Sequence, residues 1–206
     1  MKVLLGTSLL LVIVSPAVPL KCISATDITK VSDQRVLTCR PSLNVCFSSV
    51  FRTNIVGDKE ATYYGCGLAG LCRSGHYSFT SASGTFVQKI SRCCNTDMCN
   101  NETLTLPDRS TLPPNGLKCP ACFHYLFRNC TSKTTINCFG NENQCVHFKG
   151  VLKKGIHRGQ KLNFKGCATK DFCSLKNHSP FVGYYNFEPV EETCYDASET
   201  SNQPEF

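Results

Sequence analysis

The sequence predicts an all-β protein made of two tandem copies of one small, disulfide-rich domain. Three observations support this prediction. The chain holds 16 cysteines among 206 residues, the cysteine spacing occurs twice, and the segments between cysteines have the composition of strands joined by turns. Helical periodicity is hard to find.

The cysteine spacing shows the duplication most clearly. Successive intervals contain 6, 19, 5 and 20 residues in the first copy and 6, 21, 5 and 20 in the second. The cysteines that define these intervals are Cys39, Cys46, Cys66, Cys72 and Cys93, then Cys138, Cys145, Cys167, Cys173 and Cys194. Chance does not give three equal intervals and a fourth that differs by two residues, so the chain contains an internal repeat.

Strand signals fall between these cysteines in both copies. In the first copy they cover 45–52, 61–66 and 77–90, and Ser83 and Gly84 supply a turn inside the last segment. In the second copy they cover 145–152 and 161–167. We therefore expect hairpins that stand on a cysteine-rich base.

The first residues have the layout of a signal peptide. Lys2 precedes an apolar run from Val3 to Val14, which is too short for a membrane helix of about 20 residues and ends in small residues and proline. We expect residues 1–17 to be removed after Ala17, with a position just ahead of Lys21 as the alternative. The mature chain is then secreted into an oxidising compartment, where all the cysteines are expected to pair.

The remaining chain divides at a proline-rich stretch. Residues 18–101 form the first domain, 102–116 a linker, and 117–206 the second domain with a polar C-terminal tail. A lipid-anchor signal needs a hydrophobic tail, whereas 191–206 is polar and acidic, so we expect no membrane anchor. A domain of about 90 residues buries little apolar surface, so each disulfide is expected to add roughly 2–4 kcal/mol of stability.

The end of the first copy carries a family resemblance. It reads CCNTDMCN, with Cys93 and Cys94 adjacent and Cys99 followed by Asn100. This resembles the lymphocyte-antigen/urokinase-receptor (UPAR/Ly-6) superfamily, whose snake-toxin-like three-finger domains close in this way. The doubled framework, whose second copy starts with Cys119-Pro-Ala-Cys122, is similar to gamma-type phospholipase A2 inhibitors and to sodefrin-precursor-like factors.

Spacing alone leaves the disulfide connectivity open. The resemblance implies these pairs: Cys22 with Cys46, Cys39 with Cys66, Cys72 with Cys93, Cys94 with Cys99, Cys119 with Cys145, Cys122 with Cys130, Cys138 with Cys167, and Cys173 with Cys194. The chain departs from the family pattern at Ala25, where a second cysteine of the first copy would sit, and at Tyr195, which replaces the second of two adjacent cysteines. Both departures remove whole pairs.

Two chemical alternatives have weak support. The Cys119-Pro-Ala-Cys122 segment could in isolation be a redox motif or half of a zinc site. The five histidines, none of which lies in a nucleophile or metal signature, could serve acid–base chemistry: His76, His124, His147, His157 and His178. We expect structural disulfides, no metal or other cofactor, and no catalysis.

The strongest functional signal is a basic stretch. From Lys149 to Lys165 the chain has five further lysines, arginines or histidines between these two lysines and no acidic residue. Its tip supplies the candidate partner contacts Lys153, Lys154, Ile156, His157, Arg158 and Lys161. Such a hairpin could bind an acidic protein or an anionic lipid; alternatively, it is a solvated hairpin whose lysines discourage edge pairing.

Three Asn-x-Ser/Thr sequences are candidate glycosylation sites: Asn101, Asn129 and Asn177. Asn129 precedes a cysteine that is expected to be bridged, and Pro180 closely follows the third site. Asn101, at the start of the linker, is therefore the preferred candidate.

These expectations favour a secreted, non-catalytic binding protein. The resemblance implies a phospholipase A2 inhibitor-like protein that binds an extracellular protein through its finger loops. The alternative is a secreted signal, a pheromone or receptor ligand of the sodefrin-precursor-like kind. The formal charge of +7 only mildly favours acidic partners, and an exported chain is not expected to meet nucleic acid. The sequence leaves the partner and the oligomeric state open.

Overall fold

The computed structural model describes residues 18–26, 34–55, 59–126, 129–130, 134–152, 158–175 and 187–199. The expected signal segment, 1–17, lies outside these residues. The carbonyl of Leu20 accepts a hydrogen bond of 2.7 Å from the Cys39 amide. Leu20 thus contacts the first copy through its backbone.

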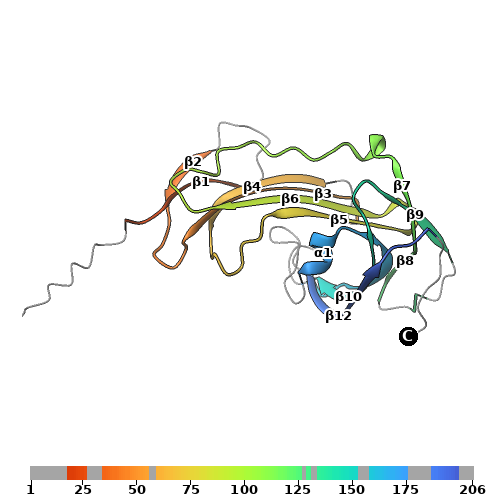
Figure 1. The fold of residues 1–206 in the computed structure, drawn as a ribbon. Coiled ribbons are helices and arrows are strands. Elements are labelled where there is room, and N and C mark those ends of the chain that lie inside the picture. Colours follow the sequence, from red (N-terminus) through yellow and green to blue (C-terminus); the bar gives the residue numbers. More distant parts are fainter. Residues whose placement is uncertain are drawn as a thin grey trace, which may run out of the picture.

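Strands dominate both copies, as the sequence predicts (Figure 1). The first copy holds β1 (Lys21–Thr26), β2 (Arg35–Thr38), β3 (Val45–Thr53), β4 (Lys59–Gly67), β5 (Gly75–Ser81) and β6 (Phe86–Cys94). The second holds β7 (Pro114–Pro120), β8 (Cys122–Tyr125), β9 (Thr135–Phe139), β10 (Gln144–Leu152), β11 (Lys161–Ala168) and β12 (Phe187–Asp196). The prediction of two tandem all-β, three-finger domains is confirmed.

The expected turn between β5 and β6 is a short 3-10 helix, η2 (Ala82–Gly84), in which Ser83 and Gly84 have φ angles of 58° and 69°. Glycine adopts this left-handed region readily, which explains why the chain reverses here. A five-residue helix, α1 (Lys170–Ser174), is not predicted by the sequence. Thr169 caps it by accepting a hydrogen bond from the Phe172 amide.

The expected linker is partly structured. It contains the 3-10 helix η3 (Arg109–Thr111), and its last three residues already belong to β7. The Leu104 side chain is buried. This stretch therefore packs on the protein along part of its length.

The two copies share one sheet. Its order is β12-β10-β11-β5-β6-β3-β4-β1-β2, and β8 adds to β11. The junction is the antiparallel pair of β5 with β11, where Gly166 lies opposite Ser81, Cys167 opposite Thr80, and Ala168 opposite Phe79. In Figure 1 the long strands of the first copy extend toward the second copy, whose β10, β12 and α1 lie below them.

Gly166 permits this junction. A Cβ atom at this position would lie 1.9 Å from the Thr80 carbonyl oxygen, a distance that no side chain can occupy. Gly65, the matching residue of the first copy, meets only the edge of the Phe47 ring at 3.3 Å. Two glycines that align in the repeat therefore carry different constraints.

The main apolar core also belongs to both copies. Phe79 of β5 packs against Phe164 of β11 with ring centroids 4.0 Å apart, and against Phe172 of α1 at 5.9 Å. The remaining members of this core are Phe51, Ile55 and Val87 from the first copy, and Val146, Phe148, Leu162, Ala168 and Cys173 from the second. The aromatic interior thus lies where the repeats meet.

Disulfides form the base of each copy. The sulfurs join Cys22–Cys46, Cys39–Cys66, Cys72–Cys93, Cys94–Cys99, Cys119–Cys145, Cys122–Cys130, Cys138–Cys167 and Cys173–Cys194. These are the pairs that the resemblance implies. Beside the first base, the buried Asn100 amide donates to the carbonyls of Ile23 and Phe47 and accepts from the Ile23 amide.

A buried carboxylate connects the two copies on the face of the junction opposite the aromatic core. Glu142 of the second copy is 1% exposed. Its Oε1 accepts hydrogen bonds from the Ser78 and Thr80 hydroxyls, at 2.5 and 2.7 Å. The Arg109 guanidinium stacks on the Phe86 and Phe139 rings nearby. Burial raises the pKa of Glu142, while the two hydroxyls and Arg109 act in the opposite direction.

We expect Gly166→Ala to lower the free energy of unfolding by about 2–4 kcal/mol, because the methyl group forces β11 away from β5. Chemical denaturation of the purified protein measures this loss. Gly65→Ala is the matched control and should cost less, since only a ring edge must move. Equal losses for the two variants would contradict the assigned junction.

Glu142 should make stability depend on pH. Its pKa is raised in the folded state, so its contribution is fully present below the ordinary glutamate pKa of about 4.3 and falls as the pH rises through the folded value. Glu142→Gln keeps an acceptor for both hydroxyls without the charge. The difference in unfolding free energy, wild type minus variant, should therefore decrease between acidic and neutral pH; a constant or rising difference would refute this account.

Candidate binding surface

The predicted basic hairpin is β10–β11, and it lies in a four-strand part of the sheet with β8 and β12. Side chains alternate along each strand. In β10, Val146 and Phe148 are buried in the shared core, while His147 and Lys149 are partly exposed between and beyond them. One face of this region is therefore apolar and the other carries charge.

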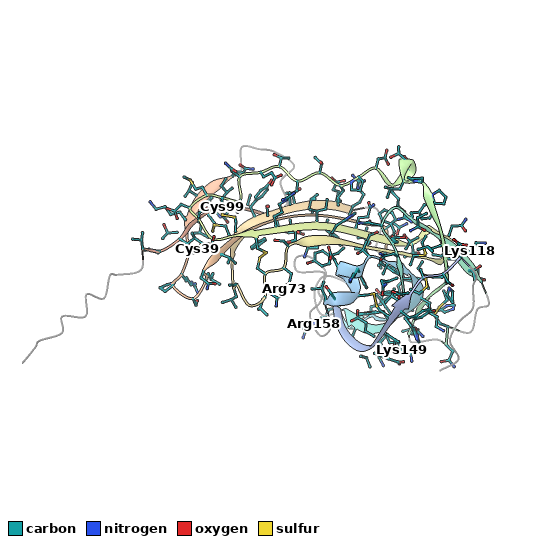
Figure 2. All side chains as sticks on the ribbon, in the orientation of Figure 1. Cys39, Arg73, Cys99, Lys118, Lys149 and Arg158 are labelled. Atoms are coloured by element: carbon teal, nitrogen blue, oxygen red, sulfur yellow. A yellow bond between two sulfur atoms is a disulfide. The ribbon has the colours of Figure 1, made fainter. Side chains whose placement is uncertain are left out.

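The strand register brings basic residues from three strands together. His147 lies opposite Lys165, and Lys149 lies opposite Asn163, which in turn faces His124. We call this surface the cationic face; its cations are Lys149, Lys161 and Lys165, and it also includes the histidines His124 and His147. Figure 2 shows Lys149 on the lower side of the molecule.

Few acidic residues oppose this charge along the chain. Between Asp108 and Asp171 the sequence has one acidic residue, Glu142, and its side chain is buried at the junction. The adjacent strand β12 does supply a carboxylate. Glu191 lies opposite Lys149 and forms an ion pair with it, and this contact lowers the pKa of Glu191.

The ion pair modifies the sequence prediction. Residues 149–165 contain no acidic side chain. However, β12, which comes later in the chain, places Glu191 against Lys149. Lys149 is therefore partly neutralised. An exposed ion pair of this kind adds little stability, so its main effect is on the local potential.

The structure places two of the predicted contact residues. Arg158 and Lys161 are exposed, and Arg158 is labelled beside the lower strands in Figure 2. Lys153, Lys154, Ile156 and His157 lie outside the described residues.

A neighbouring exposed pair was not singled out by the sequence. Tyr125, the last residue of β8, is 41% exposed, and Leu126 is 69% exposed. The Leu126 amide donates to the Lys161 carbonyl at 2.9 Å, so Leu126 lies beside the exposed Lys161. The Tyr125 hydroxyl donates to the Ile55 carbonyl of the first copy at 3.0 Å. The sequence signal that could have identified this pair is the presence of two adjacent hydrophobic residues, Tyr125 and Leu126, at the end of a strand.

Two of the three described histidines contact side-chain amides. The His147 Nε2 lies 3.1 Å from the Asn163 Oδ1, and the His76 Nδ1 lies 3.3 Å from the Asn141 Nδ2. Burial is the main cause that lowers the pKa of both rings. His124 belongs to the cationic face, while His157 and His178 lie outside the described residues.

The Cys-Pro-Ala-Cys segment is not one redox pair in this structure. Cys119 bonds to Cys145, and Cys122 bonds to Cys130. Sulfurs also cluster as Cys22, Cys39 and Cys66, and as Cys119, Cys138 and Cys167. Each belongs to a disulfide, whereas metals bind the free thiolate. The clusters are thus stacked disulfides.

Two of the three candidate glycosylation sites are described. Asn101 and Asn129 are exposed, and Asn177 lies outside the described residues. Asn101 directly follows the buried Asn100, at the start of an extended segment. Asn129 immediately precedes Cys130, which is bridged to Cys122.

We expect Asn101 to carry an N-linked glycan when the chain is exported from eukaryotic cells, because its side chain is exposed on an extended segment. Intact mass before and after enzymatic deglycosylation measures occupancy. Asn101→Gln should remove one glycan mass, with Asn129→Gln as the comparison. An unchanged mass in the Asn101 variant would eliminate this site.

Comparison with known proteins identifies relatives of both copies. The family model of the u-PAR/Ly-6 domain matches residues 20–102 and 115–204. A gamma subunit of the phospholipase A2 inhibitor from Laticauda semifasciata is 30% identical over 142 residues, which are 67% of this chain and 75% of that protein. The 25 kDa subunit of the phospholipase A2 inhibitor from Naja kaouthia is 27% identical over 186 residues, covering 86% and 95% of the two chains.

Two further similarities concern proteins with other names. The urokinase plasminogen activator surface receptor of Bos taurus is 32% identical over 163 residues, which are 75% of this chain and 46% of the receptor. The crystal structure of mouse TEX101 matches with 19% identity and a TM-score of 0.36, covering 85% of this chain and 98% of TEX101. Among the described residues, no helix has the length and apolar character needed to cross a membrane.

Proposed function

Because the chain belongs to the u-PAR/Ly-6 domain family, with a match in each of its two copies, we propose that it is a secreted, non-catalytic binding protein. Its partner is an extracellular protein of the secreted phospholipase A2 class. Two of the relatives are named phospholipase A2 inhibitors, and one of them aligns with 86% of this chain. This favours an inhibitor over the alternative of a secreted signal.

The cationic face, together with Arg158 ahead of β11, is the observation that supports this proposal. Lys161 of this face and Arg158 are both exposed, and the other face of this part of the sheet is packed into the shared core. Positive charge concentrated on one side steers an acidic partner toward that side and raises the association rate. Inhibition by covering a partner's surface needs no reactive residue on the inhibitor.

The fold supports tight binding through rigidity. Eight disulfides hold the bases, and the β5–β11 pair fixes one copy against the other. A surface that is already ordered loses little conformational entropy on binding. The relative position of the two sets of fingers is thus set before the partner arrives.

The proposal is tested with the mature chain and a panel of purified secreted phospholipases A2. We expect at least one enzyme to bind and to be slowed. The double variant Arg158→Glu, Lys161→Glu should reduce the association rate constant roughly tenfold or more at low ionic strength, with a smaller effect at high salt. Surface plasmon resonance measures the rates and a lipid-hydrolysis assay measures inhibition.

Arg40→Glu is the matched control, since Arg40 is an exposed cation of the first copy. It should leave the association rate unchanged within about twofold. If no phospholipase binds, the proposed partner class is wrong. If the enzymes bind equally well to the double variant, the partner contacts another surface.

A further inference from the structure

One corner of the second copy combines exposed apolar and cationic side chains. We call it the Leu126 corner; it consists of Tyr125, Leu126, Arg158 and Lys161. Leu126 and Tyr125 are 69% and 41% exposed, and both cations are exposed. The hydrogen bond from the Leu126 amide to the Lys161 carbonyl places these two backbones side by side, and Arg158 lies three residues before Lys161 in the chain.

The backbone of this corner is unusual for its side chain. Leu126 has a φ angle of 64°, in the left-handed region that glycine and asparagine adopt at lower cost than leucine. A large aliphatic side chain is thus kept in an unfavourable conformation although the fold does not bury it. Strain and exposure together indicate that the side chain serves a contact outside the chain.

Tyr125 is held firmly beside it. Its hydroxyl bonds to the Ile55 carbonyl, and its ring meets Phe123 edge to face at a centroid distance of 5.4 Å. The exposed part of the ring therefore has a fixed position. A rigid aromatic ring with an adjacent leucine and flanking cations is the combination that favours the boundary between lipid headgroups and acyl chains.

Charge complementarity indicates the type of lipid. The only acidic residue between Asp108 and Asp171 is the buried Glu142, so the segments that form this corner carry no exposed acidic side chain of their own. Anionic lipid surfaces attract such cations, and the attraction adds to the burial of apolar side chains. A soluble polyanion would use the cations but would gain nothing from an exposed leucine.

We propose that the Leu126 corner docks on the surface of an anionic lipid bilayer, with Leu126 and Tyr125 entering the headgroup region and Arg158 and Lys161 contacting lipid phosphates. This contact shares Arg158 and Lys161 with the proposed protein contact, but it needs no protein partner. It would hold the chain at a lipid–water interface without a membrane-spanning segment or a covalent anchor.

The test uses the full mature chain and vesicles of phosphatidylcholine with or without phosphatidylserine, in the absence of any phospholipase. We expect sedimentation with the anionic vesicles only. Removing one cation, by Arg158→Gln or Lys161→Gln, should weaken binding about fivefold. Leu126→Asn should weaken it several-fold while keeping a residue that tolerates the left-handed backbone. Leu71→Asn and Arg40→Gln, which change exposed residues of the first copy, should have no effect.

A fluorescent probe gives a second readout that does not depend on loss of binding. The chain has no tryptophan, so Leu126→Trp introduces a single one. Its emission should move to shorter wavelength on anionic vesicles and be quenched by brominated lipid, whereas Leu71→Trp should not respond.

Absence of vesicle binding overturns the proposal. So does binding that heparin reproduces and that Leu126→Asn leaves unchanged, which would identify a polyanion site. Because no protein partner is present, either result leaves the phospholipase proposal to its own test.

Discussion

The pairing of β5 with β11 is the contact on which the rest of the structure depends. It converts two small sheets into one and brings Phe79 onto Phe164. It also places Ser78 and Thr80 beside Glu142 on the opposite face. A residue with any side chain at position 166 would meet the Thr80 carbonyl. The joint therefore depends on the absence of one atom as much as on the hydrogen bonds that form it.

Two kinds of interaction stabilise different parts of the molecule: disulfides and aromatic packing. Disulfides and the residues around them hold the base of each copy, in clusters built on Cys22, Cys39 and Cys46, and on Cys119, Cys138, Cys145 and Cys167. Aromatic packing holds the junction. Small domains lack apolar surface for a core of their own, and here each obtains part of it from its neighbour. The stability that the sequence led us to expect from disulfides thus concerns the bases, while at the junction aromatic packing adds a second contribution.

Much of the fold could be predicted because its signals are local or repeated. The strands 45–52 and 161–167 and the Ser83–Gly84 turn follow from alternation and turn chemistry, and the all-β, two-copy architecture follows from spacing. The shared sheet could not be predicted, since pairing between distant strands depends on tertiary packing. For the same reason the ion pair of Glu191 with Lys149 could not be predicted, since the two residues are far apart along the chain but opposite each other in the sheet. Leu126 was missed because its backbone angle has no sequence signature.

The shared core also limits how such a chain can be rearranged by recombination. A gene segment encoding only one copy would yield a product with an uncovered aromatic surface and an unmatched strand edge, the conditions that favour aggregation. Joining the second copy to an unrelated neighbour would fail unless that neighbour offered a strand able to lie against Gly166. The unit that folds is therefore the pair of copies in this order. Sequence similarity between the copies does not make them interchangeable.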